Sequence, residues 1–208
     1  MYGLYVITDE ELSNGLSHYE IAKLACEGGA DAIQLRDKKM EKDEYTKVAM
    51  SIRRITSLHD VLFFVNDHFD VALAAEADGV HLGQGDVGSA DITKLKEKML
   101  VGISVGSVDE AVAAEKNGAD YVGFGPIFST RSKHDARAAV GTDELKRIRS
   151  SVMVPIVAIG GITKENAPDV ITSGADGIAV ISAVVSQDDV RKAAAELKNI
   201  ISSAKLRA

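Results

Sequence analysis

The chain has 208 residues, of which 46% are hydrophobic and 26% are charged. This composition is that of a globular protein whose length suits a single α/β domain with a substantial core. The formal net charge is −7, from 24 Lys and Arg residues against 31 Asp and Glu residues, which argues against non-specific binding to nucleic acid or to an anionic membrane.

The cysteine content and the hydropathy of the sequence indicate the cellular compartment. The chain holds one cysteine, Cys26, so an internal disulfide and a cysteine-cluster metal site are excluded, and we expect this residue to be buried. The first residues show no basic stretch followed by an apolar one, and no apolar run approaches roughly 18 residues. We therefore expect a cytoplasmic protein with neither a secretory signal nor a membrane partner.

Short apolar segments alternate with amphipathic ones along the whole chain. We expect strands at residues 3–8, 32–36, 62–66, 79–82, 101–105, 121–125, 156–159 and 177–181. We expect helices at residues 19–26, 42–58, 68–76, 92–98, 109–116, 142–149, 164–172 and 188–203. Short apolar strands are typical of parallel sheets buried on both faces. Eight strand–helix units predict a single-domain (β/α)8 TIM barrel over residues 1–208, in preference to an open sheet.

Two local patterns support these boundaries. Ser107 to Glu110 fits a capping box at the start of the helix expected from residue 109. A loose repeat of Gly, Ala and Asp precedes four strands, at residues 29–31, 77–79, 118–120 and 174–176. Gly can end a helix in the left-handed conformation, and Asp can accept hydrogen bonds from backbone donors near a strand start. This repeat therefore indicates the fold and not the function.

Polar or charged residues, or a Gly-Gly pair, stand where each expected strand ends. They are Thr8-Asp9, residues 34–38, Asn66-Asp67, residues 81–86, Ser104, residues 130–133, Gly160-Gly161 and residues 180–182. A (β/α)8 barrel gathers the C-terminal ends of its strands on one face, and its active site lies there.

Gln34, Arg36 and Lys38 alternate at the end of the second expected strand. With a period of two, the three side chains point the same way. They are either solvated charges at a strand end or, on the catalytic face, the ligands of an anion such as phosphate or pyrophosphate.

Asp67 and Asp86 follow adjacent expected strands. Two carboxylates brought close together repel one another unless a cation lies between them, and Mg²⁺ commonly uses one or two carboxylates together with substrate phosphates. The alternative is that each Asp caps the helix that follows it.

Residues 125–133 and the Gly-Gly pair complete the candidate site. The loop 125–133 is either a solvated surface loop or an anchored loop that closes over a ligand. Gly160-Gly161 and Ile181-Ser182 follow the last two expected strands, where barrels often bind a phosphate through backbone N–H groups.

The histidines show no metal-ligand spacing. We expect His18, His59, His68 and His134 at the surface, and His81 to pack or hydrogen-bond within its strand.

Taken together, these motifs resemble the thiamine-phosphate synthase family. The resemblance runs from Tyr5 to Ala183 and rests on residues 34–38, 66–67, 81–86, 125–133 and 158–162. Asp37 stands where the family often has Glu, and Ser129 stands where it often has Pro, which would fix the loop more firmly.

The resemblance implies two substrate subsites and a metal site. The subsite for the pyrimidine diphosphate would comprise Gln34, Leu35, Arg36, Asp37, Lys38, Asn66, Ser104 and Lys133. The subsite for the thiazole phosphate would comprise Thr130, Arg131, Ser132, Gly161, Ile181 and Ser182. Asp67 and Asp86 would bind Mg²⁺, and Arg36, Lys38, Ser104 and Lys133 would take part in catalysis.

The implied reaction joins the two halves of thiamine phosphate, and pyrophosphate leaves before the thiazole nitrogen attacks. The partners implied are small molecules, and a homo-oligomer is left open. The rival functions are a thiazole tautomerase of the same fold, a sugar-phosphate isomerase barrel and a non-catalytic protein that binds the thiazole phosphate. The retained Lys38, Asn66, Asp67, Asp86 and Lys133 argue against the tautomerase, which needs neither pyrophosphate nor metal. An isomerase would normally show a general acid–base pair in place of the cations, and a binding protein would need neither the carboxylates nor the cations at the second subsite.

Overall fold

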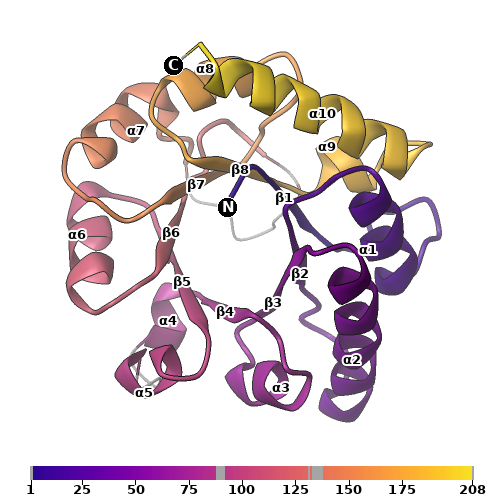
Figure 1. Ribbon diagram of the computed structural model, residues 1–208. Helices are drawn as coiled ribbons and strands as arrows, with labels where there is room; N and C mark the ends of the chain where they lie inside the picture. Colours follow the sequence, from indigo (N-terminus) through magenta and orange to yellow (C-terminus); the bar gives the residue numbers. More distant parts are fainter. Residues whose placement is uncertain (1, 88–91, 131, 133–137, 208) are drawn as a thin grey trace.

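The protein folds into a closed parallel barrel with helices outside it (Figure 1). The computed structural model describes residues 2–87, 92–130, 132 and 138–207. The strands follow chain order around the barrel, and β8 pairs with β1 to close it. They are β1 Leu4–Ile7, β2 Ala32–Leu35, β3 Leu62–Asn66, β4 Gly79–Leu82, β5 Leu100–Val105, β6 Tyr121–Phe124, β7 Ile156–Ile159 and β8 Gly177–Val180. The predicted (β/α)8 barrel is confirmed.

The helices form the outer layer in the order in which they occur. They are α1 His18–Glu27, α2 Lys42–Leu58, α3 Phe69–Ala74, α4 Gln84–Val87, α5 Ile92–Lys96, α6 Val108–Lys116, α7 Gly141–Arg149, α8 Ala167–Thr172, α9 Ser182–Val185 and α10 Val190–Lys205. Sequence periodicity did not predict α4 and α9, because four residues are too few to show an apolar period of 3.6. Among the described residues, no helix is long and apolar enough to cross a membrane.

The helix caps differ from the predicted pattern in one detail. Ser107 accepts a hydrogen bond from the Glu110 N–H as expected, but the Glu110 carboxylate binds the N–H of Gly106 and not that of Ser107. A complete capping box, not predicted, starts α1, where Ser17 and Glu20 each accept from the other's backbone N–H.

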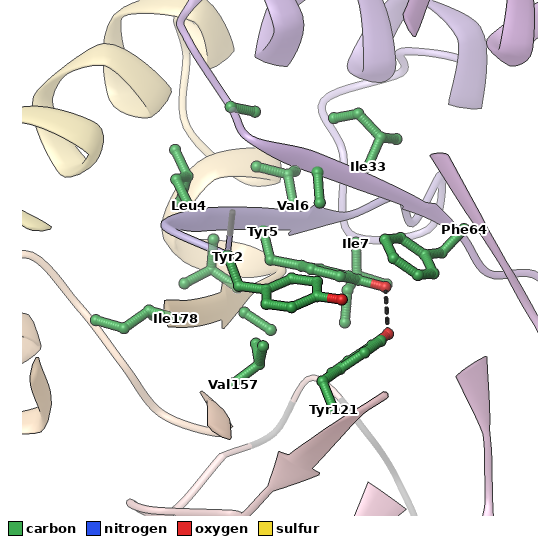
Figure 2. Close-up of a cluster of buried hydrophobic side chains, with 14 of the residues drawn as sticks. Tyr2, Leu4, Tyr5, Val6, Ile7, Ile33, Phe64, Tyr121, Val157 and Ile178 are labelled. Atoms are coloured by element: carbon green, nitrogen blue, oxygen red, sulfur yellow. Dashed lines mark hydrogen bonds between the residues drawn. The ribbon is translucent and has the colours of Figure 1, made fainter. Parts of the chain in front are cut away.

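Aromatic side chains fill the barrel interior. Figure 2 shows Tyr5 directed into a cluster with Tyr2, Phe64 and Tyr121, whereas Val6 points to the opposite side of β1. The ring centroids of Tyr2 and Tyr121 lie 4.8 Å apart, and those of Phe64 and Tyr121 lie 5.4 Å apart. Cys26 is buried, as predicted. Each ring of this size buries a large apolar area.

Glycines on the neighbouring strands make room for two of these rings, because Gly79 pairs with Phe64 and Gly102 pairs with Tyr121. A Cβ atom on Gly102 would lie 2.1 Å from Cζ of Tyr121, and a Cβ atom on Gly79 would lie 2.5 Å from Cε1 of Phe64. Both distances are far below van der Waals contact, so any side chain at either glycine would displace an aromatic ring.

The Gly-Ala-Asp repeat forms recurring clasps at the N-terminal ends of the strands. In each clasp, an Asp carboxylate accepts a hydrogen bond from the N–H of a residue at the start of the preceding strand, and that residue's carbonyl accepts from the Asp N–H. A basic side chain pairs with each carboxylate. The pairs are Asp31–Lys198, Asp78–Arg53, Asp120–Lys96 and Asp176–Arg149.

The clasp at Asp120 gives a stability prediction. Asp120→Ala leaves the buried Val101 N–H, now 2.8 Å from Oδ2, without its acceptor, so we expect a loss of about 1–3 kcal/mol in the free energy of unfolding. Asp120→Asn retains an oxygen acceptor and should lose less than the Ala variant. Urea unfolding at constant m-value measures both, and an Ala variant as stable as the wild type would show that the clasp contributes nothing.

Candidate active site

A cavity of about 600 Å³ opens at the C-terminal mouth of the barrel. Most of the residues predicted for the site line it. They are Arg36, Lys38, Asn66, Asp67, Asp86, Ser104, Thr130, Ser132, Gly161, Ile181 and Ser182. These residues come from different strands. Because all the strands of the barrel run parallel, their C-terminal ends meet at one mouth.

Three predicted residues from the second strand region do not line this cavity. Leu35 is fully buried and its side chain belongs to the hydrophobic core. Gln34 is 2% exposed, and its Nε2 donates to Tyr5 Oη at 2.9 Å. Asp37 lies in the loop after β2 and is engaged by other residues of the protein. Arg131, Lys133 and His134 lie outside the described residues.

Asp37 shapes the loop that carries Lys38. Its Oδ1 accepts from the backbone N–H groups of Lys39 and Met40, at 2.7 and 2.9 Å, and its Oδ2 lies 3.3 Å from Nε2 of His18. Burial acts to raise the pKa of Asp37, but these donors outweigh it and hold the pKa below the ordinary value. The observed role of this carboxylate is therefore to hold its own loop.

The prediction that His18 lies at the surface is wrong. His18 is 1% exposed, and its Nδ1 lies 2.7 Å from Oγ1 of Thr8, while Nε2 faces Asp37. Ser17 caps α1, so the ring of the first helical residue points back over the end of β1. His59 and His68 are exposed as predicted.

Asp67 and Asp86 lie next to each other in one wall of the cavity. Asp67 adopts the left-handed backbone conformation, with φ 62°, and its Oδ2 accepts from Nδ2 of Asn66 at 2.6 Å. Burial raises the pKa of Asp67, and the Asp86 carboxyl raises it further. The N-cap of α3 is His68 and not Asp67, so the capping alternative is wrong for Asp67.

The pair fits a hard divalent cation. Asp86 lies in α4, and its Oδ2 accepts from the Gly83 N–H at 3.2 Å, which orients it at the first turn of that helix. The described residues contain no group of three or more His, Cys, Asp or Glu able to hold a metal. Two crowded carboxylates at a cavity with room for phosphate oxygens suit Mg²⁺, which takes few protein ligands.

Ser104 lies at the end of β5 beside an inward-facing histidine. His81 Nε2 is 2.9 Å from Ser104 Oγ, and His81 Nδ1 is 2.9 Å from Tyr121 Oη. This confirms that His81 hydrogen-bonds within the barrel. Gln84 Nε2 donates to the Ser104 carbonyl at 2.6 Å. Both the hydroxyl and the backbone carbonyl of Ser104 are therefore hydrogen-bonded.

The opposite wall of the cavity is built from the loops after β6, β7 and β8. Gly160 and Gly161 have φ of 100° and 62°, which favours glycine at both positions. The N–H groups of Ile127 and Phe128 donate to the carbonyls of Ile159 and Gly160, at 2.9 and 3.0 Å. The first part of the loop 125–133 is therefore anchored to β7, as the second alternative predicted.

Ser132 and Ser182 connect the two loops of this wall. Ser132 Oγ donates to Ser182 Oγ at 3.2 Å, and Ser182 is the first residue of α9. Hydroxyl groups and backbone N–H groups grouped in this way can bind a phosphate.

Sequence reasoning missed some of the cavity-lining residues. They include Glu110, Thr163, Ser186 and Gln187. The sequence predicts only a capping role for Glu110. The others stand in loops or at a helix end, where no polarity pattern distinguishes a cavity from solvent. Gln84 also lines the cavity; it belongs to the predicted group 81–86, but the sequence predicts no role for it.

The chain is similar to known proteins over nearly its whole length. The family described as thiamine monophosphate synthase matches residues 4–184. The thiamine-phosphate synthase of Methanocella arvoryzae is 52% identical, over 99% of this chain and 97% of its own length. That of Methanoregula boonei is 53% identical, over 97% of this chain and 94% of its own length.

Solved structures show the same likeness. The thiamine phosphate pyrophosphorylase of Pyrococcus furiosus superposes with a TM-score of 0.89 at 46% identity, over 97% of this chain and 96% of that one. A 3-hexulose-6-phosphate synthase, with a TM-score of 0.71 at 20% identity over 95% of this chain and 99% of that one, shares the fold.

The raised pKa of Asp67 gives a prediction about stability and pH. A carboxyl whose pKa rises on folding stabilises the folded state in its protonated form, and this contribution is lost as the pH rises through the raised value. Asp67→Asn keeps an acceptor for Asn66 and tolerates the left-handed backbone. Without metal, we expect this variant to be more stable than the wild type at pH 7 and about equally stable below the ordinary Asp pKa of about 3.9.

Urea midpoints across this pH range measure the effect. Asp109→Asn, at an exposed carboxylate in the first turn of α6, is the control. If the difference in urea midpoint between the wild type and Asp67→Asn did not change with pH, folding would not raise the pKa of Asp67.

Proposed function

The chain belongs to the thiamine monophosphate synthase family, and from that premise we propose how the mouth of its barrel makes thiamine phosphate. The proposed substrates are 4-amino-2-methyl-5-hydroxymethylpyrimidine diphosphate and 4-methyl-5-(2-phosphooxyethyl)thiazole, and the second product is pyrophosphate. The proposal rests on the lining of the cavity. Two cationic side chains and two carboxylates line one wall, and glycine and serine residues line the other.

The first wall suits a pyrophosphate. Arg36 and Lys38 supply positive charge beside Asn66 and the carboxylate pair. Asp67 and Asp86 would hold Mg²⁺, which when bound neutralises charge on the pyrophosphate oxygens. The second wall, with Gly161, Ile181 and Ser182, suits the single phosphate of the thiazole.

The protein's own residues favour departure of the leaving group. Arg36, Lys38 and Lys133, together with the metal, would set about five positive charges against a pyrophosphate of about −3. Ser104 adds a hydroxyl within the same cavity. Charge that develops on the leaving oxygen would be stabilised by groups already in place. We propose, as the resemblance implies, that the bond from the pyrimidine methylene carbon to oxygen breaks before the thiazole nitrogen attacks.

Exclusion of water completes the proposal. Water would capture the same pyrimidine cation, so the thiazole must already be bound when pyrophosphate leaves. We propose that the loop of residues 125–133 closes over the bound substrates at this step and brings Lys133 to the pyrophosphate. Contacts of Gln34, Leu35, Asp37 and Arg131 with substrate, the cytoplasmic location and the oligomeric state stay predictions.

The assay that tests the function follows both products. Purified protein, both substrates and Mg²⁺ should give thiamine phosphate and pyrophosphate in equal amounts, and omission of the metal should abolish both. Asp86→Ala should lose at least about 100-fold in kcat, whereas Asp109→Ala should keep wild-type activity. Tight thiazole-phosphate binding without product would point to the tautomerase or to a non-catalytic binding protein.

Adjacent lysines after β2 give a matched pair of variants. Lys38 lines the cavity, whereas Lys39 forms an exposed ion pair with Glu11. Lys38→Ala should lower kcat by about 100-fold, because it removes a charge that stabilises the leaving group. Lys39→Ala should leave kcat unchanged. Steady-state kinetics of the two variants decide the matter, and equal effects would refute a specific role for Lys38.

A further inference from the structure

A chain of hydrogen bonds runs through the barrel interior and ends at the active-site cavity. Gln34 Nε2 donates to Tyr5 Oη at 2.9 Å, and Tyr5 Oη lies 3.0 Å from Tyr121 Oη (Figure 2). Tyr121 Oη lies 2.9 Å from His81 Nδ1, and His81 Nε2 lies 2.9 Å from Ser104 Oγ. Of these residues, Ser104 lines the cavity.

The direction of each bond follows from counting hydrogens. A tyrosine hydroxyl has one hydrogen to donate. Tyr5 Oη already accepts from Gln34, so its own hydrogen goes to its other partner, the oxygen of Tyr121. Tyr121 then donates its hydrogen onward to Nδ1 of His81. The reverse direction would leave the hydroxyl hydrogen of Tyr5, which is 1% exposed, without an acceptor.

This direction sets the tautomer of His81. Nδ1 accepts from Tyr121, so it carries no hydrogen, and the neutral ring carries its hydrogen on Nε2. Nε2–H therefore donates to Ser104 Oγ. Burial raises the pKa of Tyr5 and of Tyr121 well above the ordinary tyrosine value, so both hydroxyls keep their hydrogens at neutral pH.

We propose that Gln34, Tyr5, Tyr121 and His81 form a positioning chain that holds the Ser104 hydroxyl as a donor directed into the cavity. Because Ser104 Oγ accepts from His81, its own hydrogen is available to a ligand. If the proposed function holds, the acceptor is an oxygen of the departing pyrophosphate, whose charge grows as the bond breaks. The four residues act through Ser104 and are positioning residues for the reaction.

The barrel leaves space for the two rings in the middle of this chain. A Cβ atom on Gly123 would lie 2.8 Å from Cε1 of His81, and one on Gly102 would lie 2.1 Å from Cζ of Tyr121. Glycine in a strand weakens it unless another group approaches closely. Both glycines are thus explained by the rings that carry the chain.

The first test measures the tautomer and needs no activity. In ¹⁵N-histidine-labelled protein, the signals of His81 are identified by their loss in His81→Asn, and the two nitrogens of a neutral ring have distinct shifts. We expect Nε2–H in the wild type and a mixture of tautomers in Tyr121→Phe. Tyr2→Phe, which alters a ring 4.8 Å from Tyr121 outside the chain, should keep the wild-type pattern. An Nδ1–H or doubly protonated ring in the wild type would overturn the proposal.

The second test separates positioning from structure. Tyr121→Phe should lower kcat about 10-fold with little change in KM, because the lost alignment matters most in the transition state. Tyr2→Phe should change neither constant. In a Ser104→Ala background, Tyr121→Phe should have no further effect, since the hydroxyl on which it acts is gone. Multiplicative losses in the double variant would overturn the proposal.

The two tests also separate this inference from the proposed function. A wild-type protein that shows the Nε2–H tautomer but makes no thiamine phosphate would refute the function and leave the positioning chain standing. An active wild type with the other tautomer would do the reverse.

Discussion

The pairing of β1 with β8 is the constraint on which the rest of the molecule depends. Leu4 pairs with Ile178 and Val6 with Val180, and this parallel register closes the sheet. Closure sends the C-terminal ends of all the strands to one mouth. The cationic wall after β2 to β4 and the glycine–serine wall after β6 to β8 therefore face one cavity. The two sets of strands come from different halves of the chain (Figure 1).

The two ends of the barrel have separate tasks. At the N-terminal end, Asp clasps tie strand starts to the turns that precede their neighbours, and each clasp is neutralised by a basic side chain. At the C-terminal end, Asp67 remains crowded against Asp86, at a cost in its own ionisation. The clasps at the N-terminal end stabilise the fold. At the C-terminal end the two carboxylates repel each other, and a bound cation with a pyrophosphate would relieve this repulsion.

Sequence patterns predicted the elements whose own residues determine them. The segments Leu62–Asn66 and Gly79–Leu82 have the predicted bounds, because short apolar runs between polar turns define buried strands. Arg36 and Lys38 reach the cavity because a period of two fixes their direction at a strand end.

Features that depend on distant residues escaped prediction. His18 is buried because the end of β1 and the loop after β2 meet over it, and Asp37 serves that loop instead of lining the cavity. The chain from Gln34 to Ser104 crosses five strands in sequence-distant order, so no local pattern reveals it. The Glu110 carboxylate accepts from the N–H of Gly106, one residue before the predicted partner Ser107. The geometry of the turn decides between these two N–H groups.

The most direct measurement is a crystal structure of the protein with Mg²⁺, the thiazole phosphate and an unreactive analogue of the pyrimidine diphosphate. We expect the metal between Asp67 and Asp86, the diphosphate against Arg36 and Lys38, and the thiazole phosphate against Gly161 and Ser182. A diphosphate bound away from Arg36 and Lys38, or a metal that contacts neither carboxylate, would contradict this expectation.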